Sequence, residues 1–272
     1  MTKNLDKEGL SSIADNYHLF YVDLWGVVHN GVSLHEEAIK ALKEISKKNK
    51  DYVLLTNAPR PNSSVKSFLE KLGMEKEIRD HVFTSGEAAL NYLKSNLSNN
   101  FFFHVGPPRD FDLFQNFKKM KSKNIENSEY ILCTGLFDNY EENLNYYKDL
   151  LIKHTSKKLV CTNPDLTVHR GNKEEYCAGY IAKIFEELGG EVTYYGKPHK
   201  EIYKMCFKQK EKVLAIGDNL RTDIKGANNL NKDCLFISNG VHRNEFSNNV
   251  ELEKLLDKYK VRAHYFQKEL QW

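Results

Sequence analysis

Five polar residues stand where short apolar or tightly turned segments end, and their side chains suit phosphoryl transfer. They are Asp23, Thr56, Lys197, Asp218 and Asp223. A carboxylate can attack phosphorus and form an aspartyl phosphate, which divides one difficult displacement into two easier ones. Paired carboxylates and a backbone carbonyl are the hard oxygen ligands that Mg²⁺ prefers. A hydroxyl and an ammonium group can hold phosphoryl oxygens as charge develops.

Each of these residues also has an ordinary structural explanation. Asp and Thr at a strand end often stabilise a turn, and Lys197, which precedes Pro198, could be a solvated surface lysine. The combination of carboxylate, hydroxyl, lysine and paired carboxylates in one chain favours the chemical interpretation. Asp23, Thr56 and Lys197 are therefore the candidate catalytic residues. Asp23, Asp218 and Asp223 are the candidate metal ligands.

The elements that must position these residues alternate between strands and helices, which predicts an α/β fold with parallel sheets and right-handed crossovers. Continuous apolar runs predict buried strands, and apolar residues on one face predict helices. Core strands are expected at 18–23, 52–56, 81–84, 192–195, 213–216 and 234–237, helices at 34–46 and 63–72, and strands of a second sheet at 101–105, 129–133 and 159–162.

The order and spacing of these groups resemble the four motifs of the haloacid dehalogenase superfamily of aspartate-nucleophile phosphatases. The matching residues are Asp23, Thr56-Asn57, Lys197, Gly217-Asp218 and Thr222-Asp223. The resemblance implies a doubly wound, Rossmann-like parallel-sheet core. It also implies Mg²⁺ as cofactor, Asp23 as nucleophile, and Thr56, Asn57 and Lys197 around the phosphate.

The long insert between the second and third motifs resembles the α/β C2-type cap of the class IIA branch. Segments similar to that branch are Thr84-Ser85-Gly86-Glu87 and Cys161-Thr162-Asn163-Pro164-Asp165. The implied domains are a core of residues 1–86 and 186–272 and a cap of residues 87–185. Within the cap, Asn163 and Arg109 are candidate substrate-binding residues, since arginine can clamp a carboxylate or second phosphate. A turn or a surface ion pair would explain them equally well.

Trp25 departs from the family pattern. The first motif is usually Asp-x-Asp, and its second Asp protonates the leaving group and then activates water, but here that position is Trp25. Indole has one N–H donor and no acid-base equilibrium near neutrality, so it cannot replace that carboxylate. The resemblance implies that the residue two beyond the nucleophile binds Mg²⁺ through its backbone carbonyl, which Trp25 retains.

Three explanations of Trp25 stay open from the sequence. His29 could supply the proton, since imidazole titrates near neutrality. The leaving group could be good enough to need no acid. Alternatively, the protein could bind a phosphorylated ligand, or act as a regulatory protein, with little or no hydrolysis.

Composition is compatible with a soluble metabolic enzyme. The 272 residues include 40 basic and 37 acidic ones, a near balance that predicts no nucleic-acid surface. Five widely spaced cysteines and no apolar segment of signal or membrane length favour a reduced, cytoplasmic setting without membrane attachment. The expected partner is a small phosphorylated metabolite, such as a sugar phosphate or nucleotide. A homodimer formed through the cap stays open.

Overall fold

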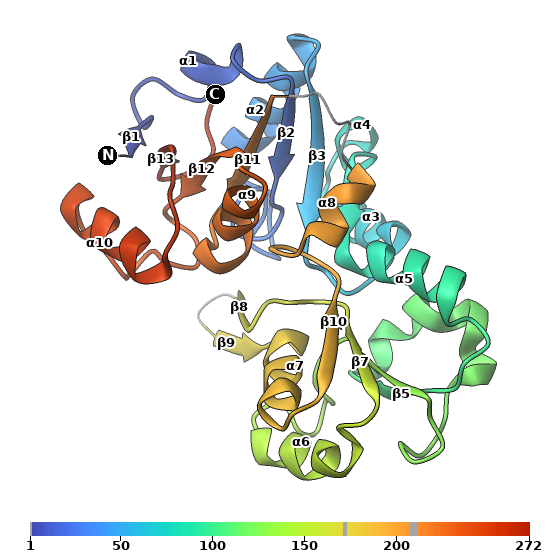
Figure 1. Cartoon of the computed structure of the whole chain (residues 1–272). Coiled ribbons are helices and arrows are strands. Elements are labelled where there is room, and N and C mark those ends of the chain that lie inside the picture. The colour runs from blue at the N-terminus through green and yellow to red at the C-terminus, as the bar shows by residue number, and fades with distance from the viewer. Residues whose placement is uncertain (1, 171–172, 207–211) are drawn as a thin grey trace. The chain divides into compact units, whose positions relative to one another are not determined.

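A computed structural model of the chain describes residues 2–170, 173–206 and 212–272. The chain divides into two compact units. The first unit comprises residues 1–56, 66–83 and 206–272, and the second comprises residues 57–65 and 84–205. Both contain a sheet with helices, so the chain has the α/β fold that the sequence predicts (Figure 1).

The first sheet has seven strands in the order β1-β13-β12-β11-β2-β3-β4, and neighbouring strands from β1 through to β3 in this order pair in parallel. The strands are β1 (Lys3–Asn4), β2 (Leu19–Val22), β3 (Asp51–Thr56), β4 (Val82–Thr84), β11 (Val213–Gly217), β12 (Asp233–Ile237) and β13 (Tyr265–Gln267). In β2 and β11 every residue is buried, as expected of parallel strands in a sheet covered on both faces.

Helices cover this sheet on both faces. In the view of Figure 1, α9 lies in front of the strands and α2 lies behind them. Helix α2 buries Ala38, Ala41, Leu42 and Ile45, an i, i+3, i+4, i+7 pattern that makes one apolar stripe. The helices of this part of the chain are α1 (Ser11–Ala14), α2 (Glu36–Lys47), α3 (Asn62–Lys71), α4 (Lys76–Arg79), α9 (Lys225–Asn229) and α10 (Asn249–Tyr259), with the π-helical turn η3 (Leu220–Ile224).

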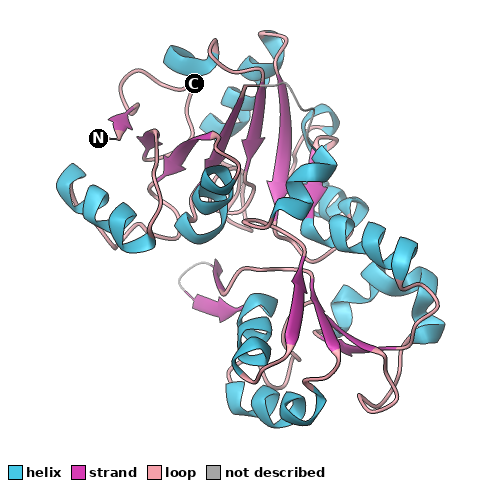
Figure 2. Ribbon diagram, in the orientation of Figure 1, coloured by secondary structure: helices cyan, strands magenta, loops and turns pink. Residues whose placement is uncertain are grey.

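The second sheet has four parallel strands in the order β10-β7-β6-β5. Its strands are β5 (Phe102–Val105), β6 (Tyr130–Cys133), β7 (Lys158–Cys161) and β10 (Glu191–Tyr194), and β8 (Thr167–Arg170) and β9 (Lys173–Tyr176) form a separate antiparallel pair. Helices α5 (Ser85–Asn96), α6 (Leu144–Leu151), α7 (Ala178–Glu187) and α8 (Lys200–Cys206) and the 3₁₀ segments η1 (Pro108–Met120) and η2 (Ile152–His154) complete the second unit. Figure 2 distinguishes these helices from the strands by colour.

One predicted strand lies in the other sheet. The sequence placed residues 192–195 in the core sheet, but β10 pairs with β7, with Val192 opposite Leu159 and Tyr194 opposite Cys161. The physical reason is helix α7, whose buried Ile181 and Phe185 pack in the same apolar cluster as the second sheet. By contrast, the predicted strands at 101–105, 129–133 and 159–162 are confirmed in the second sheet.

None of the five cysteines, all of which lie in the described part of the chain, forms a disulfide. Burial raises the pKa of each, to about 12 for Cys133, Cys206 and Cys234. A buried thiol with a raised pKa is a poor nucleophile. Among the described residues, no helix has both the length and the apolar character required to cross a membrane.

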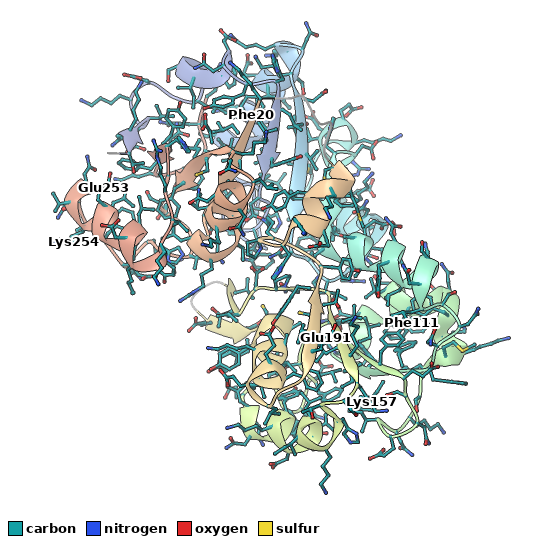
Figure 3. The ribbon with its side chains drawn as sticks, in the orientation of Figure 1. Phe20, Phe111, Lys157, Glu191, Glu253 and Lys254 are labelled. Carbon is teal, nitrogen blue, oxygen red and sulfur yellow. The ribbon has the colours of Figure 1, made fainter. Side chains whose placement is uncertain are left out.

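Phe20 tests how far the first sheet depends on its interior strand β2. Its ring lies in β2 and is completely buried (Figure 3). Phe20→Ala should lower the free energy of unfolding by about 3–5 kcal/mol, because truncation leaves a cavity in a packed core. Phe101→Ala is the control, since that ring is 49% exposed. Urea denaturation measures the free energy of unfolding of both variants. An equal decrease in the two would contradict the assignment of Phe20 to the packed core.

Candidate active site

Three buried carboxylates converge at one edge of the first sheet. Asp23 directly follows β2, Asp218 directly follows β11, and Asp223 lies in η3. One oxygen from each lies within 4.8 Å of one oxygen from each of the others, and all three residues are buried. These are the three side chains that the sequence analysis expects to be metal ligands, and the structure brings them together.

Strand register explains why Asp23 and Asp218 meet. Val22 lies opposite Ile216 in the parallel pair β2-β11, and the Asp23 N–H donates to the Ile216 carbonyl at 2.9 Å. The carboxyl ends of parallel strands meet at one edge of the sheet, which is where open α/β sheets bind ligands. The two aspartates are therefore neighbours because their strands end at the same level.

Glycine is required around Asp218 for steric reasons. A Cβ built on Gly26 would lie 2.2 Å from Asp218 Oδ2, and one built on Gly240 would lie 1.9 Å from the same oxygen. Gly26 also has φ +85°, a conformation that other residues rarely adopt. The backbone thus approaches the carboxylate from two sides, and no side chain could fit between them.

Backbone N–H groups hold two of the carboxylates. The Val241 N–H donates to Asp218 Oδ2 at 2.9 Å, and the Asn219 N–H donates to Asp223 Oδ2 at 3.2 Å. Asp223 is carried by a π-helical turn, a conformation often found at functional sites. Hydrogen bonds of this kind fix carboxylate orientation before any cation binds.

The donor set fits a hard divalent cation. Asp23, Asp218 and Asp223 offer only carboxylate oxygens at the point where they converge. Oxygen ligands of this type suit Mg²⁺, which keeps waters in its remaining positions. Soft metals prefer thiolates or imidazoles, and neither belongs to this cluster.

Trp25, two residues after Asp23, packs among aromatic side chains. Its indole is partly buried and meets the His29 ring edge-on, with centroids 5.2 Å apart. His29 in turn meets Phe68 edge-on at 5.7 Å. A Cβ on Gly31 would lie 2.5 Å from Trp25 Cη2, so the indole packs directly on the Gly31 backbone. The loop that follows β2 is therefore shaped around this indole.

His29 is poorly suited to act as a general acid or base. Burial, and secondarily the nearby His35, lower the pKa of His29 to about 4, so the ring is neutral at pH 7. Its Nδ1 accepts the Gly31 N–H at 3.0 Å. A neutral imidazole whose Nδ1 is already engaged is neither a strong acid nor an effective base near neutrality. Its packing role beside Trp25 accounts for its position.

Thr56 ends β3 in the first unit, where it is buried. The next residue, Asn57, is also buried, and its side chain clamps the backbone of Lys197 within the second unit. Asn57 Oδ1 accepts the Lys197 N–H at 2.7 Å, and Asn57 Nδ2 donates to the Lys197 carbonyl at 2.9 Å. Lys197 is only 3% exposed. The sequence predicted these residues but not the clamp that links them.

The two other predicted substrate-binding residues have different environments in the second unit. Asn163 is buried in the turn after β7, where its Oδ1 accepts the Asp165 N–H at 2.9 Å. Asp165 in turn accepts from Asn57 Nδ2 at 3.1 Å. Arg109 is 62% exposed and forms an ion pair with Asp138 at 2.8 Å. Asn163 therefore belongs to the Asn57 network, and Arg109 lies at the surface.

Sequence reasoning missed the residues that surround Asp218. Gly240 and Val241 lie more than twenty positions further along the chain and carry no chemical side chain. Their only signal is the Gly-Val-His-Arg stretch, which begins three residues after the apolar run of β12. A turn at a sheet edge next to a predicted site could have drawn attention to it.

Comparison with known proteins identifies the family. A profile described as haloacid dehalogenase-like hydrolase matches residues 20–118, and one described as HAD-hydrolase-like matches residues 194–266. A crystal structure of a hydrolase of the haloacid dehalogenase-like family from Brucella suis 1330 is 30% identical, with a TM-score of 0.83. The match covers 97% of this chain and 99% of that one. The chain belongs to the haloacid dehalogenase-like hydrolases, as its motifs predicted.

More distant structures share the fold. A possible sugar phosphatase of the HAD superfamily from Cytophaga hutchinsonii is 17% identical, with a TM-score of 0.78 over 97% of this chain and 98% of that one. A 4-nitrophenylphosphatase from Thermotoga maritima is 22% identical, with a TM-score of 0.73. The match covers 95% of this chain and 96% of that one. No curated protein sequence matches the chain.

Gly26→Ala tests the steric requirement around Asp218. Both Gly26 and the control residue Gly73 have positive φ, +85° and +87°, but a Cβ on Gly73 would meet no atom within 4 Å. Either alanine should lower stability by about 1–2 kcal/mol through backbone strain. Only Gly26→Ala should displace Asp218 and weaken Mg²⁺ binding, by about tenfold or more. Calorimetric titration showing equal affinity in both variants would contradict this account.

Proposed function

We propose that this hydrolase is a Mg²⁺-dependent phosphomonoesterase that acts on a small phosphorylated metabolite through an aspartyl phosphate on Asp23. The observation that carries the proposal is the convergence of three buried carboxylates at the carboxyl edge of the first sheet. Such a set would be strongly self-repelling without a cation. Membership of the family and the phosphatase names of several structures with the same fold add support.

The proposed chemistry has two displacements. An Asp23 carboxylate oxygen attacks phosphorus, the bond from phosphorus to the leaving oxygen breaks, and that oxygen keeps the electron pair. Water then attacks the phosphorus of the aspartyl phosphate, the bond to the Asp23 oxygen breaks, and inorganic phosphate and the free carboxylate result. Each step exchanges one P–O bond for another, so no oxidant or further reactant is needed.

The residues around Asp23 have separate proposed roles. When bound, Mg²⁺ would supply positive charge to the phosphoryl oxygens. Asp23, Asp218 and the Trp25 carbonyl would hold it, and Asp223 would orient ligands or waters. The Thr56 hydroxyl, the Asn57 side chain and the Lys197 ammonium are proposed to bind phosphoryl oxygens; for Lys197 this assignment rests on the motif order. The Asn57 clamp supports it, because it fixes the lysine backbone.

Trp25 restricts the leaving group in this scheme. No carboxylate stands two residues beyond the nucleophile, and the neutral His29 is engaged with Gly31 and packed beside the indole. The leaving oxygen must therefore depart as a stabilised anion or take its proton from the substrate or from water. We propose that the enzyme favours phosphate esters of acidic alcohols or acyl phosphates over simple alkyl phosphates.

The choice of metabolite is assigned to the second unit. Asn163 is proposed to contact substrate there, since it belongs to the network that holds Lys197. Arg109 is a weaker candidate, because its guanidinium is occupied by Asp138. Sugar phosphates and nucleotides stay within the proposed substrate range. Homodimerisation through the second unit and a cytoplasmic location also remain proposals.

Asp23→Asn tests the nucleophile. The change keeps the side-chain shape but removes the attacking carboxylate, so turnover of p-nitrophenyl phosphate should fall to background. Asp51→Asn is the control, because Asp51 is exposed at the opposite end of β3 and should keep full activity. Beryllium fluoride should label the wild type at Asp23 and leave the Asn variant unlabelled. Undiminished turnover in Asp23→Asn would place the chemistry elsewhere.

Trp25→Asp tests the missing acid. A restored carboxylate should raise the rate on an alkyl phosphate by roughly 10²–10⁴-fold, and on p-nitrophenyl phosphate by much less, because nitrophenolate leaves without a proton. Trp25→Phe is the control, since it keeps a ring without adding an acid.

Melting temperature and Mg²⁺ affinity must be followed in both Trp25 variants, because removing the indole opens the niche beside Gly31. If the fold and the metal site survive and the alkyl phosphate gains nothing, the leaving-group restriction is wrong. If the wild type hydrolyses no phosphate ester or acyl phosphate while binding Mg²⁺ and phosphate, the protein is a phospholigand binder.

A further inference from the structure

The segment that follows β12 wraps around Asp218. Gly240 approaches the carboxylate so closely that a Cβ there would lie 1.9 Å from Oδ2, and the Val241 N–H donates to the same oxygen at 2.9 Å. All of these atoms belong to the first unit. The orientation of the Asp218 carboxylate therefore depends on the position of the Gly240-Val241 segment. Other contacts must hold this segment in place.

His242, the next residue, supplies that connection. It is completely buried, and its Nε2 accepts the Leu220 N–H at 3.1 Å. Leu220 lies two residues beyond Asp218 and begins η3, the turn that carries Asp223. One short segment thus bonds to the Asp218 carboxylate through Val241 and to the backbone beyond Asp218 through His242. The two hydrogen bonds together tie both downstream carboxylates to the loop after β12.

The orientation of the His242 ring is also fixed. Because Nε2 accepts a hydrogen bond, Nδ1 carries the proton and donates to Glu245 Oε1 at 2.5 Å. Glu245 is itself held by Lys258 Nζ at 3.4 Å and by the Tyr259 hydroxyl at 3.3 Å. The Tyr259 ring meets the imidazole edge-on at 5.0 Å. Carboxylates that orient an imidazole in this way set its tautomer and hold the ring in place.

The Leu220 N–H is paired with His242 rather than with the neighbouring Asn219 side chain. The Oδ1 of Asn219 accepts from the Arg221 N–H at 2.9 Å. An unsatisfied buried N–H would destabilise this turn, since buried backbone donors need a partner. His242 therefore satisfies a donor whose position decides where Asp223 lies.

On the basis of the metal-dependent function proposed above, we propose that His242 is a positioning residue for the metal site. Oriented by Glu245, it holds the Leu220 backbone and the Gly240-Val241 segment together, so that the oxygens of Asp218 and Asp223 converge before the cation arrives. It touches neither substrate nor metal. Its effect should appear in Mg²⁺ affinity rather than only in stability.

The chain offers a matched control in His264. Its Nδ1 accepts the Cys234 N–H at 3.2 Å, and its Nε2 pairs with Asp233 at 3.0 Å. The chemistry is the same as at His242, a backbone N–H on one nitrogen and a carboxylate on the other. His264, however, contacts the beginning of β12, at the end of the strand away from Asp218. Loss of either imidazole should lower the melting temperature, but only loss of the His242 imidazole should alter the metal site.

The test is Mg²⁺ titration by calorimetry on the full chain, with the wild type and the variants His242→Ala, His242→Gln and His264→Ala. His242→Ala should weaken Mg²⁺ binding by roughly 10- to 100-fold. His242→Gln should recover most of the affinity, because its Oε1 can accept the Leu220 N–H. His264→Ala should stay within about twofold of the wild type. The Mg²⁺ concentration that half-activates p-nitrophenyl phosphate hydrolysis should shift in parallel.

Each outcome decides between the two proposals. If the wild type binds Mg²⁺ and His242→Ala binds it equally well, the positioning role is wrong and the proposed function stands. If His264→Ala weakens Mg²⁺ as much as His242→Ala, the effect is general destabilisation, and the role is again wrong. If the wild type binds no Mg²⁺, both proposals fail.

A second variant covers the case in which His242→Ala does not fold. Glu245→Ala leaves the imidazole in place but removes the group that orients it. It should weaken Mg²⁺ binding several-fold, and unchanged affinity in a folded Glu245→Ala protein would overturn the positioning role.

Discussion

Mutual repulsion among three buried carboxylates is the constraint on which the site depends. At a separation of 4 Å, two like charges repel by about 4 kcal/mol at the effective dielectric constant typical of protein surfaces. Asp23, Asp218 and Asp223 are nevertheless held together, with oxygens within 4.8 Å. The structure opposes the repulsion with parallel strands that end at one level and with N–H groups aimed at the carboxylates. A divalent cation would convert this repulsion into attraction.

The ends of the predicted core strands could be read from the sequence because burial and chemistry coincide there. An apolar strand that is buried on both faces ends at the edge of the sheet, where the chain can contact water or a ligand. Asp23, Thr56 and Asp218 stand at such strand ends. The partners of Asp218 could not be found in this way. Gly240 and Val241 act through the path of the backbone and an N–H group, and neither property is visible in residue type.

The strand at 191–194 shows a second limit. Both sheets contain short apolar strands that pair in parallel, so the residue types around Val192 do not indicate to which sheet this strand belongs. What decides is the preceding helix, whose Ile181 and Phe185 pack in the core of the second unit. Tertiary packing of that kind is a property of surfaces that the sequence pattern only partly specifies.

The residues packed around Trp25 mean that this position of the first motif cannot be considered apart from its neighbours. Gly31 leaves room for the indole, the His29 ring meets the indole edge-on, and Phe68 of α3 packs against His29. Because these four residues form one chain of contacts, we expect the residue tolerated at one position to depend on the other three. A relative with aspartate at this position would be expected to carry a different loop and a different residue at the place of Phe68. The outcome of a substitution at Trp25 is therefore expected to depend on the residues that surround it as well as on the new side chain.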